Sequence, residues 1–424
     1  MSLRIDPEQR FACSQCGRCC HRFDVVVSAA EIDLYRRRNV QALFRDTSGT
    51  PDTSGTLDPF EPIPGLPALQ RIRKRADGAC GFLSHDNRCR IHEALGAAKK
   101  PLTCRLFPYA FHPAADGVVV TASFGCPTIV ANEGPLSATG ESRIALDALR
   151  KEWFEFDRPR AAPLQLVEGR TIDTRTARVL RESLLAMLKR DRADLRDNLR
   201  RIAAAIDDLT RSRVLALADA DFAEYLALTL PHAAAKSDAA PSAAPGSPRR
   251  GAGAGAKAGA IARLLQYGFL YTVTAIRADL EHPGQSRGRL RRRRLQLLAH
   301  FHGLAPGLAR VRVNALKRRR VDINDPDIRP IVFHYLRSTL ETLGSSGRPL
   351  VDELSIAVSF LNAACALAVM NADAAGTTID RAIFSQALME AADVSHAKNA
   401  LLEWVLRRFG AGSDALWFLA GVHH

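Results

Sequence analysis

Apolar residues recur with a helical period along most of the chain beyond residue 131. In one clear case Ile144, Leu149 and Trp153 fall on a single helix face, and the pattern stops before Pro159, which cannot continue a helix. Similar patterns predict further helices over 177–189, 195–209, 214–230, 261–280, 290–301, 328–343, 351–370, 379–392 and 394–409. The sequence therefore predicts that most of the protein is α-helical.

The first 130 residues follow a different pattern, with short elements and many turn-forming residues. Runs of β-branched residues predict strands over 24–28 and 117–124, whereas Thr, Ser, Gly and Pro predict an exposed loop over 46–67. We therefore predict a mainly α protein, in which a small, irregular α+β domain precedes a helical body.

A low-complexity run of Ala, Gly, Ser and Pro interrupts the helical pattern at 233–260. Such a composition offers little to bury and is typical of a linker or an insertion. The predicted divisions are thus a domain over 1–130, a helical region over 131–232, the low-complexity run, and a second helical region over 261–424. The run either separates two helical domains or forms a loop within one body, and the sequence is compatible with both.

Composition excludes a disordered chain and a membrane bundle, because 47% of the 424 residues are hydrophobic and 25% are charged. The longest apolar stretches, 260–276 and 356–370, are interrupted by polar residues and predict buried helices. The polar N-terminus resembles no secretion signal. We therefore expect a cytoplasmic protein without a membrane partner, and the sequence makes no prediction about its oligomeric state.

The formal charge of +14 comes mainly from one segment, residues 287–320. Its twelve basic residues are Arg287, Arg289, Arg291, Arg292, Arg293, Arg294, Arg310, Arg312, Lys317, Arg318, Arg319 and Arg320, and the rest of the chain carries a net charge of only +2. Such a segment is most often a solvated helix face. It could also attract an acidic protein or pack against acidic helices of this same chain. Nucleic-acid binding is a further alternative, although no reading motif or aromatic platform accompanies the charge.

Eight of the nine cysteines lie in the N-terminal region, and four of them form a CxxCxxCC motif. The candidate metal ligands are Cys13, Cys16, Cys19, Cys20, Cys80, Cys89, Cys104 and Cys126. Two-residue spacers allow thiolates to converge on one ion, which predicts a zinc or iron–sulfur site. Eight thiols could serve two sites of four, or half of them could serve one site. The ninth, Cys365, lies in an apolar helical run and is predicted to be inert.

Adjacent Cys19 and Cys20 are expected to point apart and therefore not to bind one tetrahedral ion together. Nearby His21, His85 and His92 could replace a cysteine ligand, although surface positions are more typical of single histidines. A disulfide framework is disfavoured in a reducing cytoplasm. A purely structural metal site and a functional cluster both remain open.

The order of three motifs, FACSQCGRCC, CGFLSHDNRCRIHE and KKPLTCRLFPY, resembles the CxxCxxCC family of zinc- or iron-chelating proteins, also called YkgJ-like. The resemblance covers about the first 130 residues. It implies that seven cysteines, Cys13 to Cys104, belong to the cluster, with Cys126 as a less distinctive eighth. Lys100-Pro101 replaces the Arg-Pro that is usual in the family, which preserves the charge.

A functional relative of this family is the flagellin lysine N-methylase, which the helical remainder resembles loosely. That likeness implies S-adenosylmethionine as a cofactor and a protein substrate such as flagellin. However, the sequence shows no glycine-rich strand-to-helix loop of a Rossmann-type methyltransferase, and it predicts no catalytic residue. The alternatives are a non-enzymatic module for metal handling or protein interaction, and a zinc-stapled nucleic-acid binder.

Overall fold

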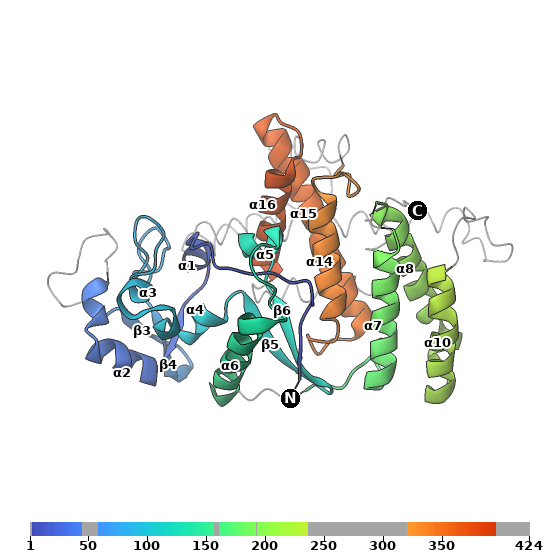
Figure 1. Ribbon diagram of the computed structural model, residues 1–424, viewed down its shortest axis with the longest axis horizontal. Coiled ribbons are helices and arrows are strands. Elements are labelled where there is room, and N and C mark those ends of the chain that lie inside the picture. The colour runs from blue at the N-terminus through green and yellow to red at the C-terminus, as the bar shows by residue number, and fades with distance from the viewer. Residues whose placement is uncertain (1, 45–57, 157–160, 192, 236–319, 396–424) are drawn as a thin grey trace, which may run out of the picture. The chain divides into compact units, whose positions relative to one another are not determined.

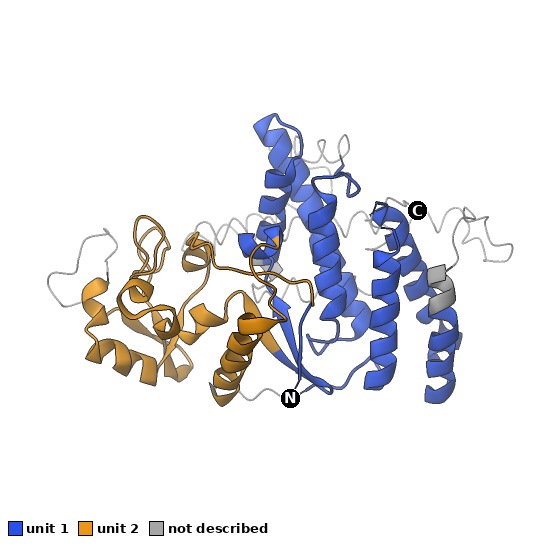
Figure 2. Cartoon of the chain, viewed as in Figure 1, with its two compact units in different colours: residues 1–6, 112–131, 160–424 blue, residues 7–111, 132–159 orange. Residues whose placement is uncertain are grey.

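A computed structural model describes residues 2–44, 58–156, 161–191, 193–235 and 320–395 of the chain (Figure 1). The chain divides into two compact units (Figure 2). Unit 1 comprises residues 1–6, 112–131 and 160–424, and unit 2 comprises residues 7–111 and 132–159. The described residues leave out most of the low-complexity run, the basic segment except Arg320, and the helices predicted over 261–280 and 290–301. Of the helix predicted over 394–409 they include only residues 394 and 395, which belong to α16. The predicted domain divisions therefore stay predictions.

Unit 2 is built on a small antiparallel sheet in the order β2-β4-β3. Its elements are α1 (Arg18–Arg22), β2 (Val26–Ser28), α2 (Ala29–Arg37), the 3₁₀ helix η1 (Val40–Leu43), β3 (Phe60–Ile63), β4 (Leu66–Ile72), α3 (Arg90–Leu95), the 3₁₀ helix η2 (Ala97–Lys99), α4 (Leu102–Leu106) and α6 (Gly140–Phe156). Helix α2 begins directly after β2, where Ser28 and Glu31 form a capping box.

The β3–β4 hairpin corrects the loop that the sequence predicted over 46–67. Ile63 pairs with Leu66 across a two-residue turn, Pro64-Gly65. Proline fixes its own backbone angle, and Gly65 adopts φ of 80°, which favours glycine. Two of the turn-forming residues between 46 and 67, Pro64 and Gly65, therefore form a hairpin turn. Residues 60–63 and 66–67 belong to the strands on either side of it.

The core of unit 2 is rich in aromatic rings. Phe44 and Phe82 pack edge to face with centroids 5.5 Å apart, and Tyr35 stacks on Phe60 at 6.1 Å. Cys80 lies inside this core, while Cys20, Cys89 and Cys104 pack against it. Cysteines from α1, from the segment between residues 80 and 89, and from α4 therefore share one hydrophobic core.

Unit 1 contains a second three-stranded sheet and most of the long helices. The sheet has the order β1-β6-β5, with β1 parallel to β6, and β5 runs across the division between the units. The elements are β1 (Leu3–Arg4), β5 (Tyr109–Ala114), β6 (Gly117–Ala122), α5 (Pro127–Ala131), α7 (Thr174–Lys189), α8 (Leu195–Leu209), α9 (Ser212–Leu215), α10 (Asp219–Ala235), α14 (Arg329–Glu341), α15 (Leu350–Ala375) and α16 (Arg381–Ser395).

The observed elements confirm the predicted fold class, a small α+β N-terminal region followed by a helical body. Helix α8 has the bounds that its apolar period predicts. The helix predicted over 214–230 is instead two helices, α9 and α10, because the apolar pattern runs across the break without marking it. Among the described helices, α15 is long and apolar enough to cross a membrane, but most of that stretch is buried inside the protein.

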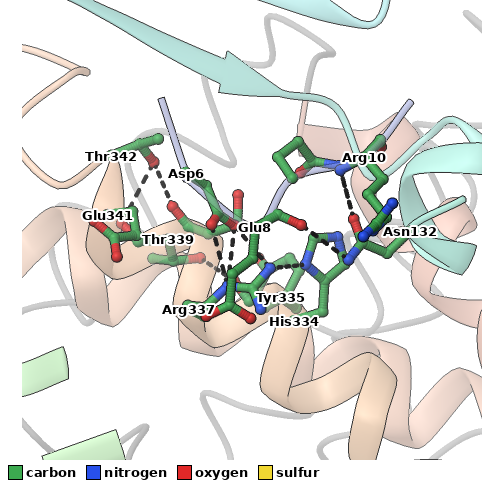
Figure 3. A network of polar contacts seen from close by, with 12 residues as sticks. Asp6, Glu8, Arg10, Asn132, His334, Tyr335, Arg337, Thr339, Glu341 and Thr342 are labelled. Atoms are coloured by element: carbon green, nitrogen blue, oxygen red, sulfur yellow. Dashed lines mark hydrogen bonds and ion pairs between the residues drawn. The ribbon is translucent and has the colours of Figure 1, made fainter. Parts of the chain in front are cut away.

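Within unit 1, a buried polar network joins Asp6, near the N-terminus, to helix α14 (Figure 3). The Arg337 guanidinium donates to both carboxylate oxygens of Asp6, at 3.1 to 3.2 Å, and to Nδ1 of His334 at 3.0 Å. Because Nδ1 accepts from a guanidinium, the proton of His334 sits on Nε2, which donates to the Ile129 carbonyl at 3.0 Å. The network ties residue 6, α5 and α14 together inside unit 1.

Candidate metal centre

The CxxCxxCC motif enters the short helix α1 through Gly17, which adopts a left-handed φ of 72°. Its carbonyl accepts from the backbone N–H groups of Cys20 and His21, which starts the helical turn. A Cβ at Gly17 would lie 2.7 Å from Oδ1 of Asn87. Glycine is therefore required here twice, for the backbone angle and for the close approach of the turn between Cys80 and Cys89.

Cys80 lies directly beside the motif, because its backbone N–H donates to the Cys20 carbonyl at 2.9 Å. The next residue, Gly81, has no room for a side chain, since a Cβ there would lie 2.0 Å from the Phe44 ring. The Cys80 side chain is 7% exposed. The sequence Cys-Gly-Phe thus places a thiol, a close backbone contact and a core ring in consecutive positions.

Cys89 is positioned by a tight turn that begins at Ser84. The Ser84 hydroxyl accepts from the Arg88 N–H at 2.8 Å, and Leu83 pairs with Cys89 as an isolated bridge. The Arg90 N–H then donates to the Phe82 carbonyl at 3.0 Å. These bonds fold the turn back, so that Cys89 precedes α3 and returns to the core beside Phe82.

Cys104 lies on α4, and polar contacts fix the start of this helix and the residues before it. Glu31 of the capping box also accepts from the Leu102 N–H at 2.6 Å, and the Thr103 hydroxyl donates to the Val26 carbonyl at 2.9 Å. The Tyr35 hydroxyl donates to the Lys99 carbonyl at 2.9 Å. Helix α2 and strand β2 therefore hold the segment that carries Cys104.

Arg105, next to Cys104, connects this segment to α6. Its guanidinium donates through two nitrogens to the Glu152 carboxylate, and its Nε donates to the Lys100 carbonyl at 2.9 Å. The fork of the guanidinium matches a carboxylate in this bidentate way.

Unit 2 brings five of the eight candidate thiols together: Cys19, Cys20, Cys80, Cys89 and Cys104. Cys13 and Cys16 are exposed on the segment before α1, and Cys13 lies close enough to Lys100 to interact electrostatically. Cys126 is buried and belongs to unit 1, where it precedes α5. Its role as a ligand, like that of the other seven, stays a prediction.

The thiols of Cys19 and Cys20 lie within hydrogen-bonding distance of each other. These adjacent side chains therefore do not point fully apart, whereas the expectation that they do not bind one tetrahedral ion together stays a prediction. Both residues belong to α1, a single turn of five residues, where side-chain rotation overcomes the angular separation of neighbouring positions.

Burial and crowding raise the cost of charge on most of these sulfurs. Burial raises the pKa of Cys80 to about 11, and burial together with the nearby Cys80 raises that of Cys104 well above its ordinary value. The hydrogen bond between Cys19 and Cys20 acts in two directions, lowering the pKa of Cys19 to about 6 and raising that of Cys20. Without a cation, the cluster keeps most of its protons at neutral pH.

Residues 12–127 match the model of the CxxCxxCC family, described as "Putative zinc- or iron-chelating domain". These residues form a CxxCxxCC domain. No curated protein and no solved structure matches the chain. The match confirms the resemblance carried by the three cysteine motifs, whereas the relation to the flagellin lysine N-methylase is not shown.

The CxxCxxCC domain also places a cation, the ammonium group of Lys100, beside the thiols. The sequence indicated Lys100 only as a position in the third cysteine motif. Lys100 is partly buried, and burial opposes its charge, but the neighbouring thiols of Cys104 and Cys89 raise its pKa. The available signal was the basic residue before Pro101 in the KKPLTCRLFPY motif, where the family usually has Arg. The spacing of residues along the sequence could not show that Lys100 lies near the thiols of Cys13, Cys19 and Cys89.

The donor chemistry of the CxxCxxCC domain fits zinc or iron–sulfur, because both prefer thiolates. Within the described residues, no group of three or more Cys, His, Asp or Glu side chains is already arranged to hold one ion. Binding therefore requires the gathered thiols to lose protons and rotate towards a common centre. His21 and His85 are exposed and His92 is half-buried, so that all three keep surface or peripheral positions.

Proposed function

We propose that the CxxCxxCC domain binds zinc or an iron–sulfur cluster through the thiolates of Cys20, Cys80, Cys89 and Cys104. The observation that carries this proposal is the shared core of unit 2, which these four cysteines enter or cover. They come from three separate segments of the chain, α1, the Cys80–Cys89 turn and α4. Four thiolates are the number that a closed zinc site or one cluster requires.

Different residues of the domain would bring the cysteines together and compensate the negative charge of their thiolates. Gly17 and Gly81 allow the backbone approaches that bring the cysteines together. Lys100 supplies a positive charge beside thiolates that otherwise repel one another. The bound group, when present, supplies the cation that stabilises the thiolate form and cross-links three segments, with an apparent binding free energy of about 10–16 kcal/mol for structural zinc.

Methyl transfer, which the resemblance implied, finds no support in the comparisons or in a recognisable cofactor-binding loop. S-Adenosylmethionine and a protein substrate such as flagellin therefore remain predictions of that resemblance. Nucleic-acid binding through 287–320 also remains a prediction, because all of that segment except Arg320 lies outside the described residues. We further propose a cytoplasmic location, which suits reduced thiols.

The proposal is tested by substituting cysteines one at a time and measuring the metal that copurifies with the protein. Cys80→Ser and Cys104→Ser should lower the metal content strongly, whereas Cys365→Ala in α15 is the matched control and should leave it unchanged. Iron with sulfide and a brown chromophore would identify a cluster, and colourless zinc a structural site. Equal metal content in all three variants would contradict the proposed ligands.

A further inference from the structure

Helix α2 contacts the start of α4 and the residues before it at two points. Glu31 accepts from the Leu102 N–H at 2.6 Å, and the Tyr35 hydroxyl donates to the Lys99 carbonyl at 2.9 Å. Residues four positions apart in a helix lie on the same face, one turn apart, so these two side chains can reach the same stretch of chain. They therefore hold both ends of the stretch 99–102 against one helix.

Helix α4 depends on Glu31 because it has no N-terminal cap of its own. Its N-cap residue is Pro101, whose side chain has no atom that could accept a hydrogen bond. Leu102 is buried, and its N–H is one of the free donors at the start of the helix that need an acceptor. The Glu31 carboxylate, 71 positions earlier in the chain, supplies this acceptor. Because the Cys104 N–H donates to the Pro101 carbonyl at 2.9 Å, holding this end of α4 also places Cys104.

Helix α2 is well anchored and can therefore support these contacts. Its residues Ile32 and Tyr35 are 4% and 0% exposed and belong to the core of unit 2. Glu31 itself is fixed through its other carboxylate oxygen, Oε2, which accepts from the Ser28 N–H at 2.8 Å and from the Ser28 hydroxyl at 3.0 Å. One carboxylate therefore joins the start of α2 to the start of α4.

We infer that Glu31 is a positioning residue of the proposed metal site and that Tyr35 assists it. The inference rests on the proposed function, because it concerns how the Cys104 thiolate reaches the bound ion. Within the described residues no group of three Cys, His, Asp or Glu side chains is already arranged around one ion, so the placing of each cysteine backbone decides which thiols can rotate to a common centre. Side chains that hold a metal ligand in place contribute to the affinity without touching the metal.

The test compares Glu31→Ala with Ser28→Ala in the full-length protein. Both changes break the capping box of α2, but only Glu31→Ala frees the Leu102 N–H. Reduced, chelator-treated protein is titrated with Co²⁺ without air, and the readouts are the cobalt–thiolate absorption band and the affinity for Zn²⁺ measured by competition. Cys104→Ser supplies the spectrum of a site that lacks this thiolate.

E31A should bind Zn²⁺ about tenfold more weakly than the wild type, with a cobalt–thiolate band reduced towards that of C104S. S28A should match the wild type in both readouts, although it loses the same cap of α2. Wild-type affinity and absorption in E31A, or equal losses in E31A and S28A, would overturn the role of Glu31 and leave the metal site standing. A wild-type protein without a cobalt–thiolate band would instead contradict the metal site, and this inference with it.

Should E31A fail to fold, Tyr35→Phe tests the second contact of α2, because it keeps the ring in the core and removes only the hydroxyl that binds the Lys99 carbonyl. Y35F should bind Zn²⁺ several-fold more weakly than the wild type. Unchanged zinc affinity in Y35F would then overturn the inference.

Discussion

At the scale of single residues, glycines decide how closely the cysteine segments approach. Gly81 follows Cys80 and faces the Phe44 ring at a distance that no Cβ can occupy. The sequence predicted the importance of the Cys80 segment from its motif, but the need for glycine depends on a ring 37 positions earlier in the chain. Only the fold reveals such a requirement.

Gly81→Ala should therefore destabilise the protein by about 2–3 kcal/mol or more, because overpacking forces the Phe44 ring or the backbone to move. Urea unfolding measures this change. The double variant with Phe44→Leu, which frees space for the new methyl group, should lose less stability than the two single changes added together. Strict additivity would show that the two residues do not compete for space.

Cys80 makes the metal-free protein sensitive to alkaline pH. Its folded pKa, about 11, lies above the ordinary value of 9.0, so the folded state holds the proton longer than the unfolded state does. The stability from this thiol is complete below about pH 9 and is lost as the pH rises towards 11, at roughly 1.4 kcal/mol for each pH unit.

Unfolding in urea with a chelator and a reductant, between pH 7.5 and 10.5, checks this sign. Cys80→Ala should flatten the dependence, because it removes the group whose pKa differs between the two states. An unchanged slope in that variant would assign the dependence to other groups.

At the scale of elements, polar contacts set the position of α4 and its cysteine. Arg105 binds Glu152 on α6 in a bidentate way and also holds the Lys100 carbonyl. Because the Glu152 side chain is 44% exposed, solvent screens the pair and limits its contribution.

Glu152→Gln should cost about 0.5–1.5 kcal/mol and speed hydrogen exchange in α4 and α6. Lys151→Gln is a suitable control on the same helix, since its side chain is 66% exposed and pairs with Asp147 within α6. Equal effects of the two changes on exchange in α4 would argue against a role of Arg105 in fastening this helix.

The elements also show what patterns along the sequence can predict. Helix α8 was predicted with its exact bounds, because a regular apolar period coincides with the Asp194 cap. The β3–β4 hairpin was missed, although Pro64-Gly65 is a typical turn pair, because neighbouring Ser and Thr residues made the region look like a loop. The gathering of Lys100 and five thiols depends on contacts between distant segments, which periodicity does not encode.

At the scale of the whole molecule, each unit has its own polar and hydrophobic organisation. Unit 1 depends on the buried pair of Asp6 and Arg337, whose side chains are 2% and 4% exposed and lie 331 positions apart in the chain. Breaking such a pair leaves one charge buried without a partner.

Asp6→Asn should therefore destabilise unit 1 by about 3–5 kcal/mol, whereas Asp6→Asn combined with Arg337→Met should recover part of that loss. Differential scanning calorimetry and hydrogen exchange in α14 measure both effects. A double variant no more stable than the single one would mean that Arg337 stabilises the fold chiefly through His334 and Phe333.

The central claim, that the gathered thiols bind a metal, is tested most directly by alkylating the cysteines of metal-loaded and chelator-treated protein and locating the labels by mass spectrometry. We expect metal to protect Cys20, Cys80, Cys89 and Cys104 together and to leave the labelling of Cys365 unchanged. A labelling pattern that is the same with and without metal would contradict the account.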